Sequence, residues 1–388
     1  MAKDKKKTNE LFEFFGITRP LFINKALNGE DRQRFVDREY LLKYFKAAVQ
    51  GGNSCAIIGS PGSGKSSFLI KLKEELKTSA YCDYLQFSFP PDEHEKSRMH
   101  FLRAILRSIL YLIMNEEELL KLYDKNEIEL ERKRLEYSII IENHTKTQKS
   151  IEGGFEAGIK NDLLKMLIPV DISSHVDANR TQEIEKGETF DFPSHNENTL
   201  YDAIVKVTRK LDEPIVLLID ELDKVGRFPL ENPEWDKEVI KILELSREIM
   251  ANEKLIMVFS LQNELYEKLV NAEKGEYNVS ILGLINLFEK LDGFDLEFAR
   301  SAVARSLEFA GYAKPQENLI EKCVLEIILD VVKGNPRLFM TYLIKLYLKA
   351  SVLKQPTITQ ELLKDYLFSL FKEEMTEDRW QELLKKAA

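Results

Sequence analysis

Residues 54–77 combine an apolar run, a glycine-rich loop and a helical pattern, in that order. The apolar run covers 54–58, the loop reads Gly-Ser-Pro-Gly-Ser-Gly at 59–64, and the helical pattern covers 65–77. A short apolar run bounded by turn residues is typical of a buried strand. Because a strand that passes through a tight loop into a helix is a unit of parallel sheets, we expect an α/β fold.

Further segments fit the same sheet and then give way to helices. The helical pattern from residue 295 onward is broken at Gly311 and at Gly334-Asn335-Pro336, and residues 11–50 also have a helical pattern. We expect a parallel sheet sandwiched by helices, followed by an all-α lid domain. The expected strands cover 54–59, 81–89, 215–220, 255–261 and 287–294. The expected domains are a basic tail (1–10), an α/β base (11–136 and 194–294), a small β-containing insertion (137–193), and a helical lid with the C-terminal helices (295–388).

Composition favours a folded protein and argues against a dedicated nucleic-acid coat or a polybasic membrane binder, while a local basic patch stays open. The 388 residues include 44% hydrophobic residues, and 65 acids against 56 bases give a net charge of −9. Nucleic-acid-binding proteins usually carry a net basic face. No apolar run reaches the roughly 18–20 residues that cross a bilayer. The three cysteines are far apart, and the N-terminal residues lack the apolar core of a signal peptide. We expect a cytoplasmic protein that does not contact membranes.

The loop matches the pattern GxxxxGK[ST], which binds nucleotide phosphates when it joins a strand to a helix. Its glycines let successive backbone N–H groups point at phosphate oxygens. Lys65 supplies a positive charge for the β- and γ-phosphates, and the Ser66 hydroxyl can ligate Mg²⁺. The predicted nucleotide-binding residues of this segment are Gly59, Ser60, Pro61, Gly62, Ser63, Gly64, Lys65, Ser66 and Ser67.

A second motif follows the apolar run at 215–219. Asp220 ends this expected strand and Glu221 follows it directly. An aspartate at the carboxyl end of a neighbouring strand can hold Mg²⁺ beside the phosphates, and a glutamate next to it can orient or deprotonate water. The sequence therefore predicts Asp220 with Ser66 as metal ligands and Glu221 with Lys65 as catalytic residues.

Four segments of this chain resemble motifs of the AAA+ ATPases within the P-loop superfamily, most closely the origin-initiator, STAND and KAP-like branches. The resemblance covers about 11–90 and 197–350, and it implies an ATPase that uses ATP and Mg²⁺. The four segments are RFVDRE at 34–39, GSPGSGKSS at 59–67, IVLLIDELDK at 215–224 and GNPRLFMTYL at 334–343.

The same resemblance implies further site residues. Val36 and Arg38 match a segment that lies against adenine and ribose, although Asp37 stands where glycine is common. Ser260 matches a polar residue that checks the γ-phosphate, with Gln262 as a second possibility. Arg337 matches the lid arginine that points at the γ-phosphate. Each has a simpler alternative, because serine is ordinary at a strand end and Gly-Asn-Pro also begins helices.

Two features depart from the family pattern. Residues 248–299 contain no arginine, although ring-forming members usually carry an arginine finger there. The finger would then come from Arg227, from Arg300 or from a partner protein. The chain is also longer between the second and third expected strands, and the insertion at 137–193 has more acids than bases. An acidic insertion suits a protein contact better than a nucleic-acid contact.

These observations lead to one main function and two alternatives. The main function is an ATP-hydrolysing switch that couples nucleotide state to assembly with a protein partner or effector, as in STAND- and KAP-like systems that include bacterial defence, and self-association is compatible with it. One alternative is a DNA-associated initiator or transposition regulator. It is less favoured because residues 295–388 carry equal numbers of acids and bases and leave little chain for a winged-helix domain. The other alternative is a non-catalytic scaffold stabilised by nucleotide.

Overall fold

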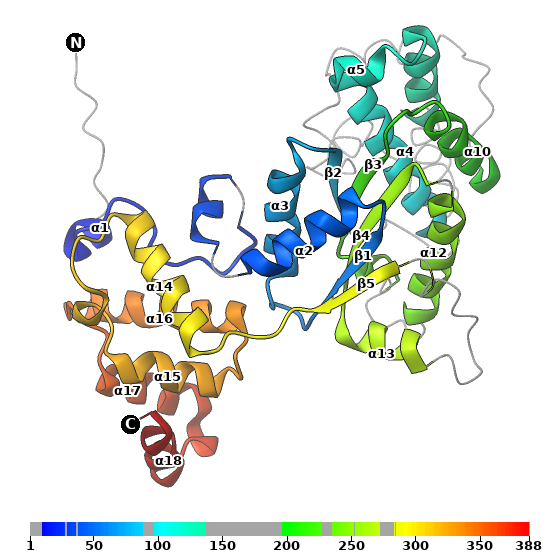
Figure 1. The fold of residues 1–388 in the computed structure, drawn as a ribbon. Coiled ribbons are helices and arrows are strands. Elements are labelled where there is room, and N and C mark those ends of the chain that lie inside the picture. Colours follow the sequence, from blue (N-terminus) through cyan, green and yellow to red (C-terminus); the bar gives the residue numbers. More distant parts are fainter. Residues whose placement is uncertain are drawn as a thin grey trace, which may run out of the picture. The chain divides into compact units, whose positions relative to one another are not determined.

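Figure 1 shows the chain in a computed structural model, which divides into two compact units. The first unit comprises Met1–Phe101 and Leu211–Ala388, and the second comprises Leu102–Lys210. In the described part of the chain, no helix has both the length and the apolar character needed to cross a bilayer. The described residues are 10–27, 29–35, 38–87, 97–136, 196–226, 235–251, 253–271, 283 and 285–387.

The first unit is built on a five-stranded parallel sheet in the order β2-β3-β4-β1-β5. Every residue of the three central strands is buried, whereas both edge strands contain partly exposed residues. Central strands covered on both faces consist of continuous apolar residues, which is the pattern the sequence shows. The strands are β1 (Ser54–Ile58), β2 (Tyr81–Gln86), β3 (Ile215–Asp220), β4 (Leu255–Leu261) and β5 (Ile285–Lys290).

Helices α2 (Glu39–Gln50) and α3 (Lys65–Leu76) share one hydrophobic cluster with alternate residues of the strands. Phe45 and Phe68 meet edge to face in this cluster, with ring centroids 5.1 Å apart. The intervening strand residues point to the opposite face and are also buried, so that face is covered as well. The remaining helices of this region are α11 (Asp223–Gly226), α12 (Trp235–Met250) and α13 (Asn263–Asn271).

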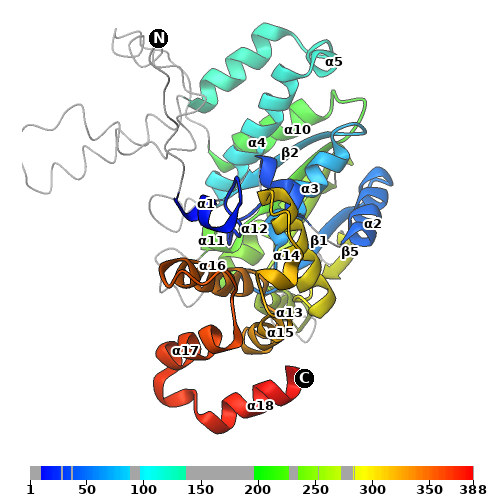
Figure 2. The ribbon, with the colours of Figure 1, turned by 90° about the vertical axis from the view of Figure 1, so that its left-hand side faces the viewer.

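The C-terminal residues form the lid, a group of helices with its own hydrophobic core. The side chains of Asp295, Asn335 and Thr359 accept hydrogen bonds from backbone N–H groups and cap three of the helices. In both views α17 and α18 lie at the end of the lid farthest from the sheet (Figures 1 and 2). The lid comprises α14 (Leu296–Ala310), η5 (Gln316–Asn318), α15 (Lys322–Val331), α16 (Pro336–Val352), α17 (Gln360–Phe371), η6 (Lys372–Glu374) and α18 (Glu377–Ala387).

The N-terminal segment packs into the lid core. Helix α1 covers Glu10–Phe15, an irregular stretch follows, and the 3-10 helix η1 covers Gly29–Arg34. The sequence analysis expected helix over 11–50 and grouped these residues with the base. Gly16 at φ +65° and Pro20 interrupt the helix. Phe15, Ile17, Leu21 and Phe22 are buried in the same cluster as the lid helices.

The second unit is helical in its described part. Helix α4 (Ser97–Asn115) extends into it, and α5 (Glu117–Leu120), a helix over 125–136 and α10 (Glu197–Thr208) complete it. The Tyr123 hydroxyl donates a hydrogen bond to the Val207 carbonyl at 2.6 Å. Glu127 forms ion pairs with Lys206 and Lys210 at 2.7 and 2.8 Å. These contacts join α10 to residues that precede it by about eighty positions.

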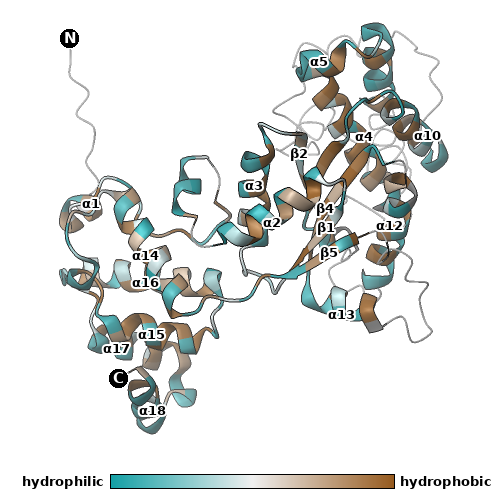
Figure 3. Ribbon diagram, in the orientation of Figure 1, coloured by the Kyte–Doolittle hydropathy of each residue, from teal (hydrophilic) through white to brown (hydrophobic). Residues whose placement is uncertain are grey.

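The structure confirms the predicted fold class, a parallel sheet with helices followed by helices alone. All five expected strands form, although β2 ends at Gln86 and β5 covers Ile285–Lys290, earlier than expected. Hydrophobic residues are concentrated along the strands, as the sequence pattern requires (Figure 3). The predicted insertion at 137–193 lies outside the described residues, and the predicted division into domains stays a prediction.

The lid core provides a test of this packing. Phe339 is fully buried in the lid, whereas its neighbour Leu338 is 46% exposed on the same helix. We expect Phe339→Ala to lower the free energy of unfolding of the lid by about 3–5 kcal/mol, because it leaves a cavity. Leu338→Ala is the matched control, with a change within about 0.5 kcal/mol. Chemical denaturation followed by Trp380 fluorescence in a Trp235→Phe background reports on the lid, and equal effects of the two variants would contradict this packing.

Candidate functional site

A cleft of about 420 Å³ opens in the first unit at the carboxyl ends of β3 and β4. Ligands of open α/β sheets bind at this edge, where loops follow the strands. The cleft walls come from segments that are far apart in the sequence. They are residues 23–27, Arg34, Phe35 and Arg38 from the N-terminal part, the loop 61–67, Asp220, Glu221, Asp223, Lys224, Ser260 and Gln262 from the strand ends, and Phe294, Ala302, Ser306, Pro336, Arg337 and Met340 from the lid side.

The glycine-rich loop takes a conformation that only glycine adopts without strain. Gly62 and Gly64 have φ angles of +84° and +98°, and Gly64 is the N-cap of α3. The Lys65 ammonium donates hydrogen bonds to the carbonyl oxygens of Gly59 and Ser60 at 2.6 and 3.1 Å. Burial lowers the pKa of Lys65, while the nearby charge of Asp220 opposes this shift. The loop therefore holds a partly buried cation at the start of a helix.

Asp220 is buried and has two hydrogen-bond donors. The Tyr84 hydroxyl donates to Asp220 Oδ2 at 2.6 Å, and the Glu221 backbone N–H donates to Asp220 Oδ1 at 2.9 Å. Burial and the charge of Asp220 raise the pKa of Tyr84, so the phenol stays protonated and acts as a donor. Tyr84 also shares a side-chain hydrogen bond with Ser66. One phenol thus lies within hydrogen-bonding reach of both predicted metal ligands.

Glu221 follows Asp220 with a positive φ of +58°. A non-glycine residue in this region is strained, and such strain often occurs at functional sites. The carboxylate oxygen Oε2 accepts a hydrogen bond from Gln86 Nε2 at 2.7 Å and forms an ion pair with Lys224 Nζ at 2.6 Å. The Glu221 side chain is 25% exposed and faces the cleft, held by these two contacts.

The end of β4 adds polar groups next to the same edge. Ser260 is buried and lines the cleft. Gln262 Nε2 donates a hydrogen bond to Asp223 Oδ2 at 2.5 Å, and Asn263 Nδ2 donates to Ser60 Oγ at 3.0 Å. These bonds connect β4 to the acidic turn after β3 and to the glycine-rich loop.

The start of α16 lies directly on the glycine-rich loop. Asn335 accepts the capping hydrogen bond of α16 from the Leu338 N–H and donates its amide to the Pro61 carbonyl at 2.9 Å. The Arg337 N–H donates to the Gly62 carbonyl at 3.3 Å. A Cβ on Gly62 would lie 2.9 Å from both Arg337 Cβ and Asn335 Oδ1, so this contact requires glycine. The Arg337 side chain lines the cleft and is exposed.

The N-terminal part contributes apolar side chains to the cleft, namely Ile23, Ala26, Leu27 and Phe35. Arg38 from the same part also lines the cleft and donates a hydrogen bond to the Asp292 carbonyl at 2.7 Å. The cleft therefore combines charged groups of the loop and the strand ends with apolar side chains of the N-terminal segment.

The structure brings most predicted site residues to one place. Lys65, Ser66, Asp220, Glu221 and the residues Pro61, Gly62, Ser63, Gly64, Ser67, Arg38, Ser260 and Arg337 all line the cleft, and Gln262 does so as well. Gly59 and Ser60 do not line it but provide the carbonyls that hold Lys65. Val36 lies outside the described residues.

Sequence reasoning missed the residues that support the site. Tyr84 and Gln86 belong to β2, an edge strand that carries no recognisable motif, and Asn335 was considered only as part of a helix start. Gln86 lies beside Asp220 because of the register of the parallel pairing, which the sequence does not state. No pattern in the sequence indicates that residues 23–27 reach the cleft.

The close approach at Gly62 gives a testable expectation. Gly52 has a similar φ of +80°, but a Cβ added to it would meet no atom within 4 Å, so Gly52→Ala is a matched control for strain alone. Both substitutions to alanine are expected to cost about 1–2 kcal/mol in backbone strain. Only Gly62→Ala also separates the loop from α16. Hydrogen exchange of the Arg337 amide should therefore rise in Gly62→Ala and stay unchanged in Gly52→Ala, and equal exchange in both would exclude the steric contact.

Comparison with solved structures finds Orc and Cdc6 proteins of low sequence identity. The Orc1 protein of Aeropyrum pernix in complex with DNA is 10% identical, with a TM-score of 0.47, covering 91% of this chain and 71% of that one. The Orc2 protein of the same organism, in ADPNP–ADP complexes, is 12% identical with a TM-score of 0.44, covering 94% and 72%. Cdc6p of Pyrobaculum aerophilum is 12% identical with a TM-score of 0.44, covering 91% and 69%.

A search of curated proteins gives no match. The KAP family P-loop domain, in contrast, matches residues 41–281. This match covers more than half of the chain and includes the glycine-rich loop, the Asp220–Glu221 pair and Ser260. It confirms the resemblance to KAP-like P-loop ATPases that the sequence motifs indicated. The chain belongs to the KAP family of P-loop NTPases.

Proposed function

We propose that this chain binds ATP in the cleft of the first unit, hydrolyses it, and passes the nucleotide state to a protein partner. The observation that supports this function most directly is the grouping of Lys65, Asp220, Glu221 and Arg337 around one cleft. Two cations suit the phosphates, and two carboxylates suit a metal ion and a water molecule. The apolar side chains that the N-terminal segment contributes to the cleft suit a nucleotide base.

The glycine-rich loop is proposed to hold the phosphates. Its backbone N–H groups and the start of α3 favour anions. Lys65 bonds to the carbonyls of Gly59 and Ser60 and is partly buried, and this burial lowers its pKa. A phosphate oxygen offers this ammonium a negative charge in place of neutral carbonyls. Binding of ATP therefore replaces hydrogen bonds to neutral acceptors by one to a charged acceptor, in which both partners are ionised.

The residues present fit Mg²⁺. Ser66 and Asp220 provide the hydroxyl and carboxylate oxygens that this ion prefers, and both lie within reach of Tyr84. When bound, Mg²⁺ would neutralise charge on the phosphate oxygens. Tyr84 keeps the Asp220 carboxylate oriented through its hydrogen bond, and the Glu221 N–H holds the other oxygen. Ser66 and Asp220 are thus the proposed metal ligands.

Glu221 is proposed to orient the attacking water and accept its proton. The water oxygen bonds to the γ-phosphorus while the bond to the β–γ bridging oxygen breaks, giving ADP and phosphate. For this role the carboxylate must leave Gln86 and Lys224, which hold it in the present arrangement. Ser260 and Arg337 are proposed to contact the γ-phosphate from the strand end and from the lid. Arg38 and Val36 are proposed to contact the base and ribose, together with the apolar cleft residues of the N-terminal part, which are Ile23, Ala26, Leu27 and Phe35.

Coupling to a partner is proposed to follow from the contact between loop and lid. Asn335 and Arg337 bond to the carbonyls of Pro61 and Gly62, so a change in loop conformation reaches α16 directly. The partner is proposed to be a protein effector, as in KAP- or STAND-like systems that include bacterial defence, with self-association as part of assembly. An arginine finger is not assigned, because Arg227 lies outside the described residues and Arg300 is paired with Glu326 at 2.7 Å.

Substitution of the proposed base tests the reaction. Glu221→Gln keeps the size and hydrogen-bonding capacity of the side chain but removes its basicity. We expect kcat for ATP hydrolysis to fall by about 10²- to 10⁴-fold with ATP affinity retained. Lys65→Ala should instead abolish binding, and Glu264→Gln, on the exposed face of α13 outside the cleft, is the matched control. Fluorescent-nucleotide titration and phosphate release measure both quantities, and unchanged turnover in Glu221→Gln would refute its role.

Mass photometry tests whether nucleotide controls assembly. We expect the mass distribution without nucleotide, with ADP and with a non-hydrolysable ATP analogue to differ, because the loop contacts the lid through bonds that a bound phosphate would disturb. A distribution that is identical in all three states, with slow turnover, would favour the nucleotide-stabilised scaffold. Salt-dependent DNA binding that requires ATP would instead favour the DNA-associated alternative.

A further inference from the structure

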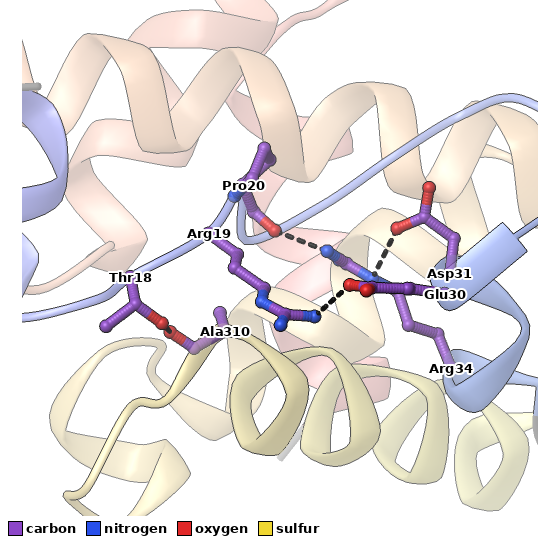
Figure 4. Close-up of polar contacts among 7 residues, drawn as sticks. All are labelled: Thr18, Arg19, Pro20, Glu30, Asp31, Arg34 and Ala310. Carbon is purple, nitrogen blue, oxygen red and sulfur yellow. Dashed lines mark hydrogen bonds and ion pairs between the residues drawn. The ribbon is translucent and has the colours of Figure 1, made fainter.

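A buried arginine lies between the N-terminal segment and the lid. Arg34 is 4% exposed, and its guanidinium donates a hydrogen bond to the Leu21 carbonyl at 2.6 Å. It also donates a hydrogen bond to the Pro20 carbonyl at 2.5 Å (Figure 4). Its Nε lies 3.3 Å from Asp31 Oδ1. The guanidinium carbon also lies 4.5 Å from the centre of the Phe309 ring on α14. A charge buried to this degree is stable only where its donors are satisfied.

The carbonyls that Arg34 holds belong to a strap, which we define as residues 17–27. The strap is attached to the lid, because Thr18 N–H donates to the Ala310 carbonyl at 2.8 Å and Asn24 Nδ2 donates to Thr341 Oγ1 at 3.2 Å. Leu21 and Phe22 are buried in the lid core. At its other end the Leu27 N–H donates to Ser67 Oγ at 3.1 Å, next to the glycine-rich loop. Residues 23–27 line the cleft, and Ile23, Ala26 and Leu27 give it apolar side chains.

Arg34 itself belongs to η1, which contacts both the base and lid helix α14. Arg32 in the same 3-10 helix forms an ion pair with Glu74 on α3. Arg34 therefore connects the strap to a segment that is also paired with the base. Two backbone carbonyls of the strap depend on its planar fork, a geometry that lysine does not reproduce.

We propose that Arg34 is a positioning residue that fixes the strap as the base-side wall of the nucleotide cleft. This inference rests on the proposed nucleotide binding and adds to it the residue that shapes the nucleoside end of the site. Without the guanidinium, the carbonyls of Pro20 and Leu21 lose their donors, and residues 23–27 lose a fixed position. A wall that is not preorganised must be ordered when the ligand binds, and this lowers affinity.

The proposal predicts a selective effect on ligands. The strap contributes apolar side chains to the cleft that suit a nucleoside, whereas Lys65 and the glycine-rich loop contribute the groups that suit phosphates. Loss of Arg34 should weaken ATP and ADP equally, because both carry the same nucleoside. It should leave the affinity for inorganic pyrophosphate unchanged, because pyrophosphate carries no nucleoside. General destabilisation of the fold would weaken all three ligands together.

The chain supplies a matched control in Arg305 on α14, the helix that carries Phe309. Its guanidinium pairs with Glu308 at 3.3 Å, its side chain is 56% exposed, and it belongs neither to the strap nor to the cleft lining. Arg305→Met removes one arginine charge from the lid without touching the strap. Arg34→Lys keeps the charge but loses the planar guanidinium fork. Its Kd for ATP and ADP should therefore lie between the values for wild type and Arg34→Met.

The experiment is isothermal titration of ATP, ADP and pyrophosphate into the full chain, with folding checked by circular dichroism. We expect Arg34→Met to raise the Kd for ATP and ADP by about tenfold and to leave the Kd for pyrophosphate unchanged, whereas Arg305→Met should leave all three values unchanged. Equal losses for all three ligands, or no loss for ATP, would overturn the positioning role. Wild type that binds neither ATP nor pyrophosphate would instead refute the proposed function.

If Arg34→Met does not fold, Asn24→Ala provides a second test of the proposal. Asn24 is exposed and holds the strap through Thr341 without contacting Arg34. The expected result is a smaller rise in the Kd for ATP and ADP, again with pyrophosphate unchanged. An unchanged affinity for ATP in both Asn24→Ala and Arg34→Lys would contradict the proposal.

Discussion

Parallel pairing of the central strands is the constraint on which the rest of the structure depends. Because β1, β3 and β4 run in the same direction, their carboxyl ends meet at one edge. The chain leaves β1 at the glycine-rich loop, leaves β3 at Asp220 and leaves β4 after Ser260. Residues separated by about two hundred positions in the sequence are therefore neighbours as a direct result of the parallel strand pairing. Burial of all three strands keeps this edge rigid.

Much of the fold and of the charged part of the cleft was predictable from the sequence. Continuous apolar runs specify central strands, and the loop pattern between β1 and α3 specifies both a conformation and a chemistry. The supporting residues were not predictable in the same way. Tyr84 and Gln86 lie on an edge strand, and their importance depends on a pairing register that the sequence does not state. The strap was missed because its helical pattern hid the interruptions at Gly16 and Pro20.

The lid shows how one residue can belong to two parts of a site. Asn335 is an ordinary N-cap when α16 is considered alone, and its second hydrogen bond to Pro61 becomes visible only when the loop is present. Gly62 has the corresponding double role, because its φ angle suits the loop and its missing side chain admits the lid. Local sequence rules explain the first role of each residue. Tertiary contact explains the second, and it is the second that joins the lid to the loop.

Three charged groups at the centre of the cleft have protein partners in this arrangement. Lys65 bonds to loop carbonyls, Asp220 accepts from Tyr84, and Glu221 is held by Gln86 and Lys224. Since an unpaired buried charge is costly, these contacts stabilise the cleft before a ligand arrives. A nucleotide must replace the partners of Lys65, and hydrolysis as proposed requires the release of Glu221 as well. Binding would then require Lys65 to leave its carbonyl partners, and hydrolysis would require Glu221 to leave Gln86 and Lys224. Because these two changes are separate, ATP could be bound without being hydrolysed.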